Sequence, residues 1–171
     1  VNGNFYDGPA KYRFALGDAT PASRRRIQRI YSFYLTLTGS RRIVDKNPEV
    51  VYRIPYVREF FPDARFIFLV RNGWDTVYST TAWSKREGRQ VKSVVEDWWG
   101  ADRRKWKFVT DQLVSTDPIL SQHKNEIAAF IRHEDMAAVE WTISVREGLQ
   151  WLEKLPGSVH LIRYEHLTEK P

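Results

Sequence analysis

Residues 64–79 read Ala-Arg-Phe-Ile-Phe-Leu-Val-Arg-Asn-Gly-Trp-Asp-Thr-Val-Tyr-Ser. The apolar run from Phe66 to Val70 is too short, and too rich in aromatic and β-branched side chains, for a helix, so it predicts a strand buried on both faces. After Gly73 the apolar side chains fall at helical spacing, and Asp75 stands in the first turn, where a carboxylate suits the helix dipole. The segment therefore predicts a strand, a tight turn and a helix.

Two polar residues of this segment lie where a strand–turn–helix unit binds ligands. Arg71 follows the strand directly, and Ser79 lies two turns along the helix. In open α/β sheets, ligands gather at the carboxyl ends of strands, where the next helix offers free backbone N–H groups to an anion. We therefore expect Arg71 to lie at a ligand-binding edge of a sheet.

Four segments, in this order along the chain, carry a family resemblance: Val44–Pro48 (Val-Asp-Lys-Asn-Pro), Phe60–Ile67 (Phe-Phe-Pro-Asp-Ala-Arg-Phe-Ile), the Arg71/Ser79 pair, and Val159–Leu167 (Val-His-Leu-Ile-Arg-Tyr-Glu-His-Leu) with Lys170-Pro171. The set resembles the sulfotransferases that use 3′-phosphoadenosine 5′-phosphosulfate (PAPS), of the bacterial and carbohydrate type. The resemblance covers residues 41–85 and 157–171. It implies a three-layer α/β fold with a mainly parallel sheet, as in P-loop nucleotide kinases, in one domain over residues 1–171.

The resemblance also implies roles for particular residues. Sulfonyl transfer from PAPS to a hydroxyl or amine requires a grip on two phosphates, a cation near the moving group and a proton acceptor. Arg71 and Ser79 then hold the 3′-phosphate, and Tyr164 packs near the nucleotide. Lys46 lies near the sulfonyl group and Asp45 beside it is the candidate base. The alternatives are a structural hydrogen-bond acceptor for Asp45, a buried structural tyrosine for Tyr164, and a solvated lysine or turn brace for Lys46.

The front of the chain departs from the family pattern. Members begin with a strand and a glycine-rich loop that cradles the 5′-phosphosulfate. Residues 1–40 contain no such segment. We expect the strand and loop to lie upstream, so that this sequence is incomplete at its N-terminus and does not turn over the donor alone.

Composition and charge limit the partners. Residues 1–110 carry 21 Lys/Arg against 11 Asp/Glu, a charge of +10, and residues 111–171 carry 6 against 10, a charge of −4. A basic half favours a polyanionic or phosphate-rich partner, without choosing among them. The four histidines lack the spacing of metal ligands, and no cysteine is present, so we expect no metal site. No apolar run has the length of a membrane span, and we expect a cytoplasmic protein.

The rest of the chain predicts mainly helices. The first 20 residues have no sustained period. The predicted elements are a helix over 21–38, a short strand over 41–44, a helix from 48 kinked or broken at Pro55, a long helix over 91–115, a helical stretch over 117–131, a helix over 135–155 and a last strand over 159–163. The tryptophans of the long helix are predicted to be core rather than a sugar-stacking platform.

Two other functions stay open at this stage. A phosphotransferase of related fold would want a P-loop and a Mg²⁺-binding carboxylate. A non-enzymatic binder of nucleic acid or acidic glycan would explain the basic half, but not the spacing of Arg71 and Ser79. The sulfotransferase interpretation makes PAPS and an acceptor the partners, the acceptor being a carbohydrate, a small molecule or a peptide, with no nucleic acid.

Overall fold

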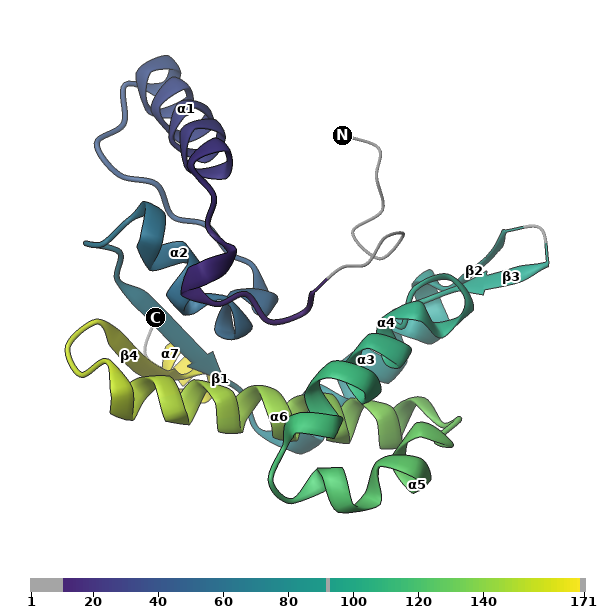
Figure 1. The fold of residues 1–171 in the computed structure, drawn as a ribbon. Coiled ribbons are helices and arrows are strands. Elements are labelled where there is room, and N and C mark those ends of the chain that lie inside the picture. The colour runs from purple at the N-terminus through teal and green to yellow at the C-terminus, as the bar shows by residue number, and fades with distance from the viewer. Residues whose placement is uncertain (1–10, 92, 170–171) are drawn as a thin grey trace.

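A computed structural model describes residues 11–91 and 93–169. It shows a mixed α/β protein in which a small parallel sheet is accompanied by many helices (Figure 1). The predicted irregular start is seen at residues 11–20, which hold only a short 3-10 turn, and residues 1–10 lie outside the described part.

The sheet pairs the two strands that the sequence motifs predict. Strand β1 (Phe66–Val70) runs parallel to β4 (Val159–Arg163), with Phe66 opposite Val159 and Val70 opposite Arg163. The pairing is in full register, so both strands end at the same edge of the sheet. Arg71, directly after β1, and Tyr164, directly after β4, are thereby brought to that edge.

Strand β1 is not buried on both faces, which corrects the prediction. Exposure alternates along it, and Ile67 and Leu69 are 67% and 47% exposed. The other face packs on helix α6 (His133–Lys154), where the ring of Phe68 lies so close to Gly148 that a Cβ there would fall 2.1 Å from it. A continuous apolar run is compatible with a strand that is covered on one face or on both. In the described part of the chain, the face of β1 that carries Ile67 and Leu69 is left open.

The predicted bounds hold for α1 and, within two residues, for α6. Thr20 caps α1 (Pro21–Thr38) by accepting a hydrogen bond from the Ser23 amide, and Gly39 ends it with a φ of 63°. Pro55 breaks the next helix as predicted, into a 3-10 turn (Pro48–Tyr52) and α2 (Ile54–Phe60). The remaining helices are α3 (Gly73–Glu87), α4 (Arg104–Phe108), α5 (Lys124–Ala128), α6 and α7 (Tyr164–Glu169).

Three predicted elements are wrong in whole or in part. Residues 41–44 form no strand, because they find no partner strand and Val44 stays 94% exposed. Residues 91–115 are not one helix: the hairpin of β2 (Arg89–Val91) and β3 (Val94–Glu96) precedes α4 and a π-helical turn (Val109–Leu113). Gly100, at a φ of 74°, breaks the helical path. Residues 117–131 hold only a 3-10 turn and the short α5.

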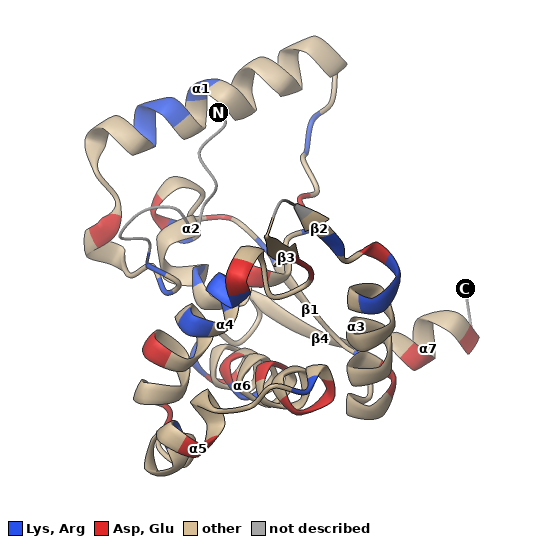
Figure 2. Ribbon diagram, turned by 90° about the vertical axis from the view of Figure 1, so that its right-hand side faces the viewer, with Lys and Arg blue, Asp and Glu red and all other residues tan. Residues whose placement is uncertain are grey.

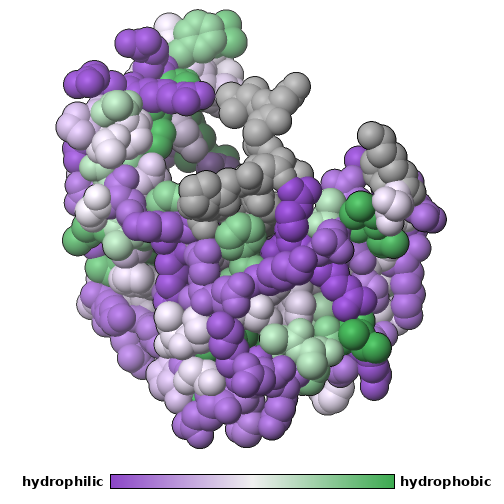
Figure 3. All heavy atoms as spheres, turned by 45° about the vertical axis from the view of Figure 1, so that its right-hand side comes forward, coloured by the Kyte–Doolittle hydropathy of each residue, from purple (hydrophilic) through white to green (hydrophobic). Residues whose placement is uncertain are grey.

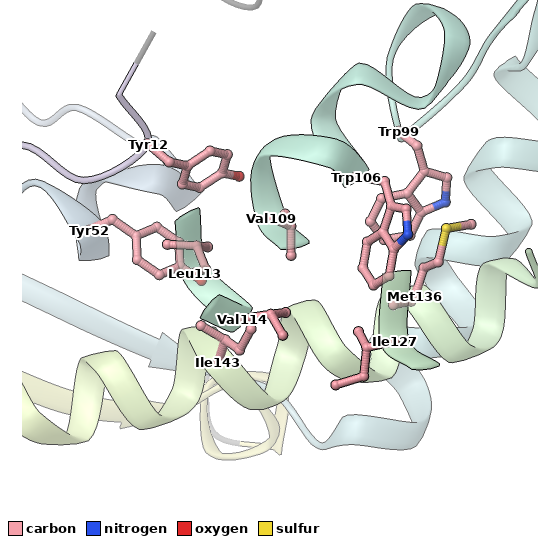
Figure 4. Close-up of a cluster of buried hydrophobic side chains, with 11 residues drawn as sticks. Tyr12, Tyr52, Trp99, Trp106, Val109, Leu113, Val114, Ile127, Met136 and Ile143 are labelled. Atoms are coloured by element: carbon pink, nitrogen blue, oxygen red, sulfur yellow. The ribbon is translucent and has the colours of Figure 1, made fainter. Parts of the chain in front are cut away.

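The core lies among the helices rather than on the sheet. It gathers side chains from the segment before α1, from the 3-10 turn before α2, from the region between β3 and α6, and from α6 itself, as Figure 4 shows for ten labelled members. Its buried residues are Tyr12, Tyr52, Trp99, Trp106, Val109, Leu113, Val114, Ile127, Met136, Ala137 and Ile143. Trp99 and Trp106, both buried, confirm the core interpretation of these tryptophans.

Helix α1 contrasts with this core. It has no buried residue and stands apart from the helices around α6 (Figure 1). Hydrophobic side chains reach the surface at the top of the molecule, where α1 lies (Figure 3). The exposed apolar residues of α1 are Ile30, Phe33, Tyr34 and Leu37. Among the described residues, no helix is long and apolar enough to cross a bilayer.

Candidate active site

The turn between β1 and α3 is built by a local capping arrangement. The side-chain oxygen of Asn72 accepts the Asp75 amide at 2.9 Å, and its side-chain nitrogen donates to the Asp75 carboxylate at 2.7 Å. The backbone carbonyl of Asn72 also accepts the Thr76 hydroxyl at 2.9 Å. The first of these bonds satisfies the Asp75 N–H, one of the backbone groups that a helix N-terminus leaves unpaired, and it fixes the start of α3 at Gly73.

Arg71 stands at the head of this turn with its guanidinium only loosely engaged. Its Nη2 lies 3.6 Å from the Asp75 carboxylate, which is an ion pair too long for a good hydrogen bond. Its Nε is buried and has no hydrogen-bond partner among the described residues. Buried donors in folded proteins are normally paired. A buried, unpaired donor on a half-exposed arginine is therefore what a site for an anionic ligand would leave open.

Tyr164 comes to Arg71 from the neighbouring strand. The Arg71 guanidinium lies over the Tyr164 ring, 5.1 Å from its centroid. Tyr164 is 38% exposed, so its ring is a partly open platform rather than a core side chain. Arginine is attracted to the face of such a ring and gains a preferred plane there. The structure thus brings together Arg71 and Tyr164, which are far apart in the sequence.

Glu165 joins the same edge. Its carboxylate accepts the backbone N–H of Asn72 at 2.8 Å and lies 3.5 Å from the Asn72 side-chain nitrogen. The backbone hydrogen bond from Asn72, with help from the positive charge of Arg71, lowers the pKa of Glu165 below its usual range. Glu165 is therefore a carboxylate at neutral pH. Figure 2 shows α7, which carries Glu165, beside the first turns of α3.

The remaining expected site residues do not touch this cluster. Ser79 is exposed on α3, and among the described residues it forms no hydrogen bond. Lys46 is exposed in the extended segment before the Pro48 turn and has no ion pair within the described chain. No hydrogen bond or ion pair between described residues links Lys46 or Asp45 to Arg71.

Asp45 has a partner of its own. It accepts a hydrogen bond from the Tyr31 hydroxyl of α1 at 2.9 Å. Burial, and then the Asp45 carboxylate, raise the pKa of Tyr31, so the phenol stays protonated and continues to donate. This contact ties α1 to the segment that carries Lys46. It is the contact that a structural acceptor at position 45 would make.

The described residues form open depressions on the surface. One of about 470 Å³ is lined by residues of α1, namely Ala22, Arg25, Arg26, Arg29 and Ile30. An open depression of about 420 Å³ is lined by Pro62, before β1, and by Leu155, at the end of α6, which places it at the other end of the strand from Arg71. In residues 11–91 and 93–169, no group of three or more metal-ligating side chains is close enough to hold an ion.

Three residues at this edge escaped the sequence analysis. Glu165 could have been found, since it comes just after β4 and the parallel pairing puts it beside Arg71. Asn72 carries the familiar signal of an N-cap before a helix. Trp141 of α6, whose indole Nε1 donates to the backbone carbonyl of Arg71 at 3.0 Å, gave no local signal, because its position depends on how α6 packs.

Comparison with known proteins identifies the family of this chain. The model of the sulfotransferase family matches residues 8–171, which is nearly the whole chain and includes every residue of the cluster. Neither the curated proteins nor the solved structures contain a match. A match of this extent supports a transferase with sulfotransferase activity in general. The chain belongs to the sulfotransferase family.

Proposed function

We propose that this protein transfers a sulfonyl group from PAPS to a hydroxyl or amine of an acceptor, and that Arg71 holds the donor's 3′-phosphate. One observation carries the proposal: the Arg71 guanidinium, at the carboxyl end of β1, has a buried Nε without a partner among the described residues and only a loose ion pair. A phosphate could accept from Nε and a terminal nitrogen together, since the planar fork of arginine suits bidentate oxyanions.

The other residues take roles that their places suggest. Ser79 lies on the helix that begins beside Arg71, and its hydroxyl can donate to the same phosphate. Tyr164 holds the plane of the guanidinium. The N-terminus of α3 adds its dipole, because its first backbone N–H groups point toward the edge where an anion would lie.

The chemical step itself is assigned to Lys46 and Asp45. The sulfur–oxygen bond to the 5′-phosphate breaks as the acceptor oxygen or nitrogen bonds to sulfur, and the acceptor loses a proton. The ammonium of Lys46 would stabilise the charge that collects on the leaving oxygen. Asp45 would take the proton, for which it must keep a carboxylate oxygen free beside its bond from Tyr31. Binding of donor must bring these residues near Arg71.

A thermal-shift titration tests the donor class. We expect adenosine 3′,5′-bisphosphate to raise the melting temperature more than ATP at equal concentration, because only the bisphosphate carries a 3′-phosphate for Arg71. A ligand that binds only the native state stabilises it in proportion to the logarithm of its concentration over Kd. A larger shift with ATP would favour a phosphotransferase, and a larger shift with an oligonucleotide a nucleic-acid binder. Either result would reject the proposal.

A further inference from the structure

The peptide group that joins Arg71 to Asn72 is held at both of its polar ends. Its carbonyl, from Arg71, accepts the indole N–H of Trp141 at 3.0 Å. Its N–H, from Asn72, donates to the Glu165 carboxylate at 2.8 Å. The two partners come from α6 and α7, so three separate elements meet on one peptide group.

Two hydrogen bonds to one peptide group fix its orientation, which a single bond could not do. Because a peptide group is planar, fixing its carbonyl and its N–H fixes the plane and removes the freedom to rotate about the adjoining ψ angle of Arg71. The Arg71 side chain then leaves the end of β1 in one direction. A single hydrogen bond would leave the plane free to turn about that bond.

The surroundings allow the indole to come this close. Gly73 packs against the Trp141 ring, and a Cβ there would lie 3.4 Å from three of its carbons. That separation is an ordinary van der Waals contact, which leaves little space for a larger side chain. The Trp141 ring therefore packs directly on the first residue of α3.

We propose that Glu165 and Trp141 are positioning residues for the anion site, which hold the Arg71–Asn72 peptide group and thereby aim the Arg71 guanidinium at the ligand. The proposal rests on the proposed role of Arg71 in binding a 3′-phosphate. Neither residue touches the ligand in this account. Tyr164 completes the arrangement by supporting the guanidinium with the face of its ring.

Electrostatic repulsion and a positioning role predict opposite effects on phosphate binding when Glu165 is removed. A carboxylate beside a phosphate site repels the phosphate, so its removal should tighten binding if charge were all that mattered. If Glu165 aims Arg71, its removal should weaken binding in spite of the lost repulsion. The sign of the change therefore separates the two accounts.

The test uses three variants and a matched control. Glu165→Ala removes the acceptor, and Glu165→Gln keeps an acceptor oxygen without the charge. Trp141→Phe keeps an aromatic ring but removes the indole N–H, which donates to the carbonyl of the same peptide group. Glu169→Gln is the control, because Glu169 lies on the same helix, is exposed and has no partner among the described residues.

Titration calorimetry with adenosine 3′,5′-bisphosphate and with adenosine 5′-monophosphate gives the first readout. We expect Glu165→Ala to weaken bisphosphate binding about tenfold, the size of one lost charged hydrogen bond, with little change for the monophosphate. Glu165→Gln should recover part of the loss, Trp141→Phe should weaken the bisphosphate in the same way, and Glu169→Gln should bind as the unchanged protein does. Unchanged or tighter bisphosphate binding by Glu165→Ala would overturn the proposal.

A second readout keeps this inference separate from the proposed function. Nitrogen-15 relaxation of the Arg71 Nε–Hε group, without ligand, reports how firmly the side chain is held. We expect its order parameter to fall in Glu165→Ala and in Trp141→Phe, but not in Glu169→Gln. If the unchanged protein fails to prefer the bisphosphate, the proposed function is wrong and relaxation still decides the positioning role. Unaltered Arg71 order in both folded variants would reject that role, and should one variant unfold, the other decides.

Discussion

The helical core and the carboxyl edge of the sheet are held together by different forces. In the core, Trp99, Leu113 and Met136 are fully buried, and apolar surface makes most of their contacts. At the edge, the partly exposed Arg71 lies over the Tyr164 ring in a cation–π contact, and Glu165 accepts the backbone N–H of Asn72. Burial supplies free energy, while exposed polar contacts supply little of it but fix direction. The contacts of the motif residues therefore fix the orientation of side chains at this edge and add little to the stability of the fold.

Removing a core side chain should give the largest loss of stability. Trp99 is buried completely, and its indole donates to His133 at 2.9 Å. We expect Trp99→Ala to lower the free energy of unfolding by about 3–5 kcal/mol, measured by urea denaturation. Trp74→Ala is the control: Trp74 is 89% exposed, so its loss should change stability by less than about 0.5 kcal/mol. Similar losses for the two tryptophans would remove the contrast between core and edge.

Lys46 should show the opposite pattern, a loss of activity without a loss of stability. In protein that carries out the transfer, Lys46→Ala should lower kcat by about 10²–10³, as when one preorganised charge-stabilising donor is removed. Affinity for the bisphosphate should change little, since the charge on the leaving oxygen appears only during transfer. Arg42→Ala, which removes an exposed cation from the same extended segment, should leave kcat unchanged. An unaltered kcat in Lys46→Ala would make Lys46 a solvated lysine, and an unfolded variant would make it a brace of the turn.

A substitution at the contact between the sheet and α6 should cost less stability than Trp99→Ala and more than Lys46→Ala. A Cβ at Gly148 would lie 2.1 Å from the Phe68 ring, so in Gly148→Ala either the ring must turn away or the strand and helix must move apart. We expect it to cost about 1–3 kcal/mol of unfolding free energy. Gly17→Ala, with nothing within 4 Å of the new methyl group, should be neutral or slightly stabilising. A neutral Gly148→Ala would show that β1 and β4 pack more loosely on α6 than the structure indicates.

Tyr52 gives the core a pH dependence of its own at the alkaline end. Burial raises the pKa of Tyr52 from its usual 10.0, an effect that outweighs the lowering by its hydrogen bond to Ser144. Since the folded-state pKa lies above the unfolded one, the contribution of the protonated tyrosine is complete below about pH 10. It is lost above that pH, at up to about 1.4 kcal/mol per pH unit. Denaturation of Tyr52→Phe between about pH 9 and 11 should show a shallower decline than the unchanged protein, and an equal decline would contradict the assignment.

The elements with strong local signals could be predicted from the sequence. Thr20-Pro21 marks the start of α1, and the run from Phe66 to Gly73 marks β1 and the turn into α3. These features depend on neighbouring residues only. The Arg71 edge could be inferred from them, because parallel strands place their carboxyl ends together.

The errors arose where distant contacts decide. Residues 91–115 carry large apolar side chains at nearly helical spacing, yet Asp102 and Arg103 adopt φ values of 52° and 55°, which no pattern of side chains announces. Arg41–Val44 has strand-like residues, but a strand needs a partner. Whether one or both faces of β1 are covered likewise depends on what packs there. Trp141 belongs to the same class, since only the packing of α6 brings it to Arg71.

The central claim, that Arg71 recognises a 3′-phosphate, is tested most directly by comparing two nucleotides that differ in that phosphate. Titration calorimetry should show tighter binding of adenosine 3′,5′-bisphosphate than of adenosine 5′-monophosphate. Arg71→Ala should weaken the bisphosphate at least about tenfold, as expected for a lost charged hydrogen bond, and leave the monophosphate unchanged. Arg25→Ala, which removes an exposed cation of α1, should alter neither. Equal affinity of the unchanged protein for the two nucleotides would contradict the account.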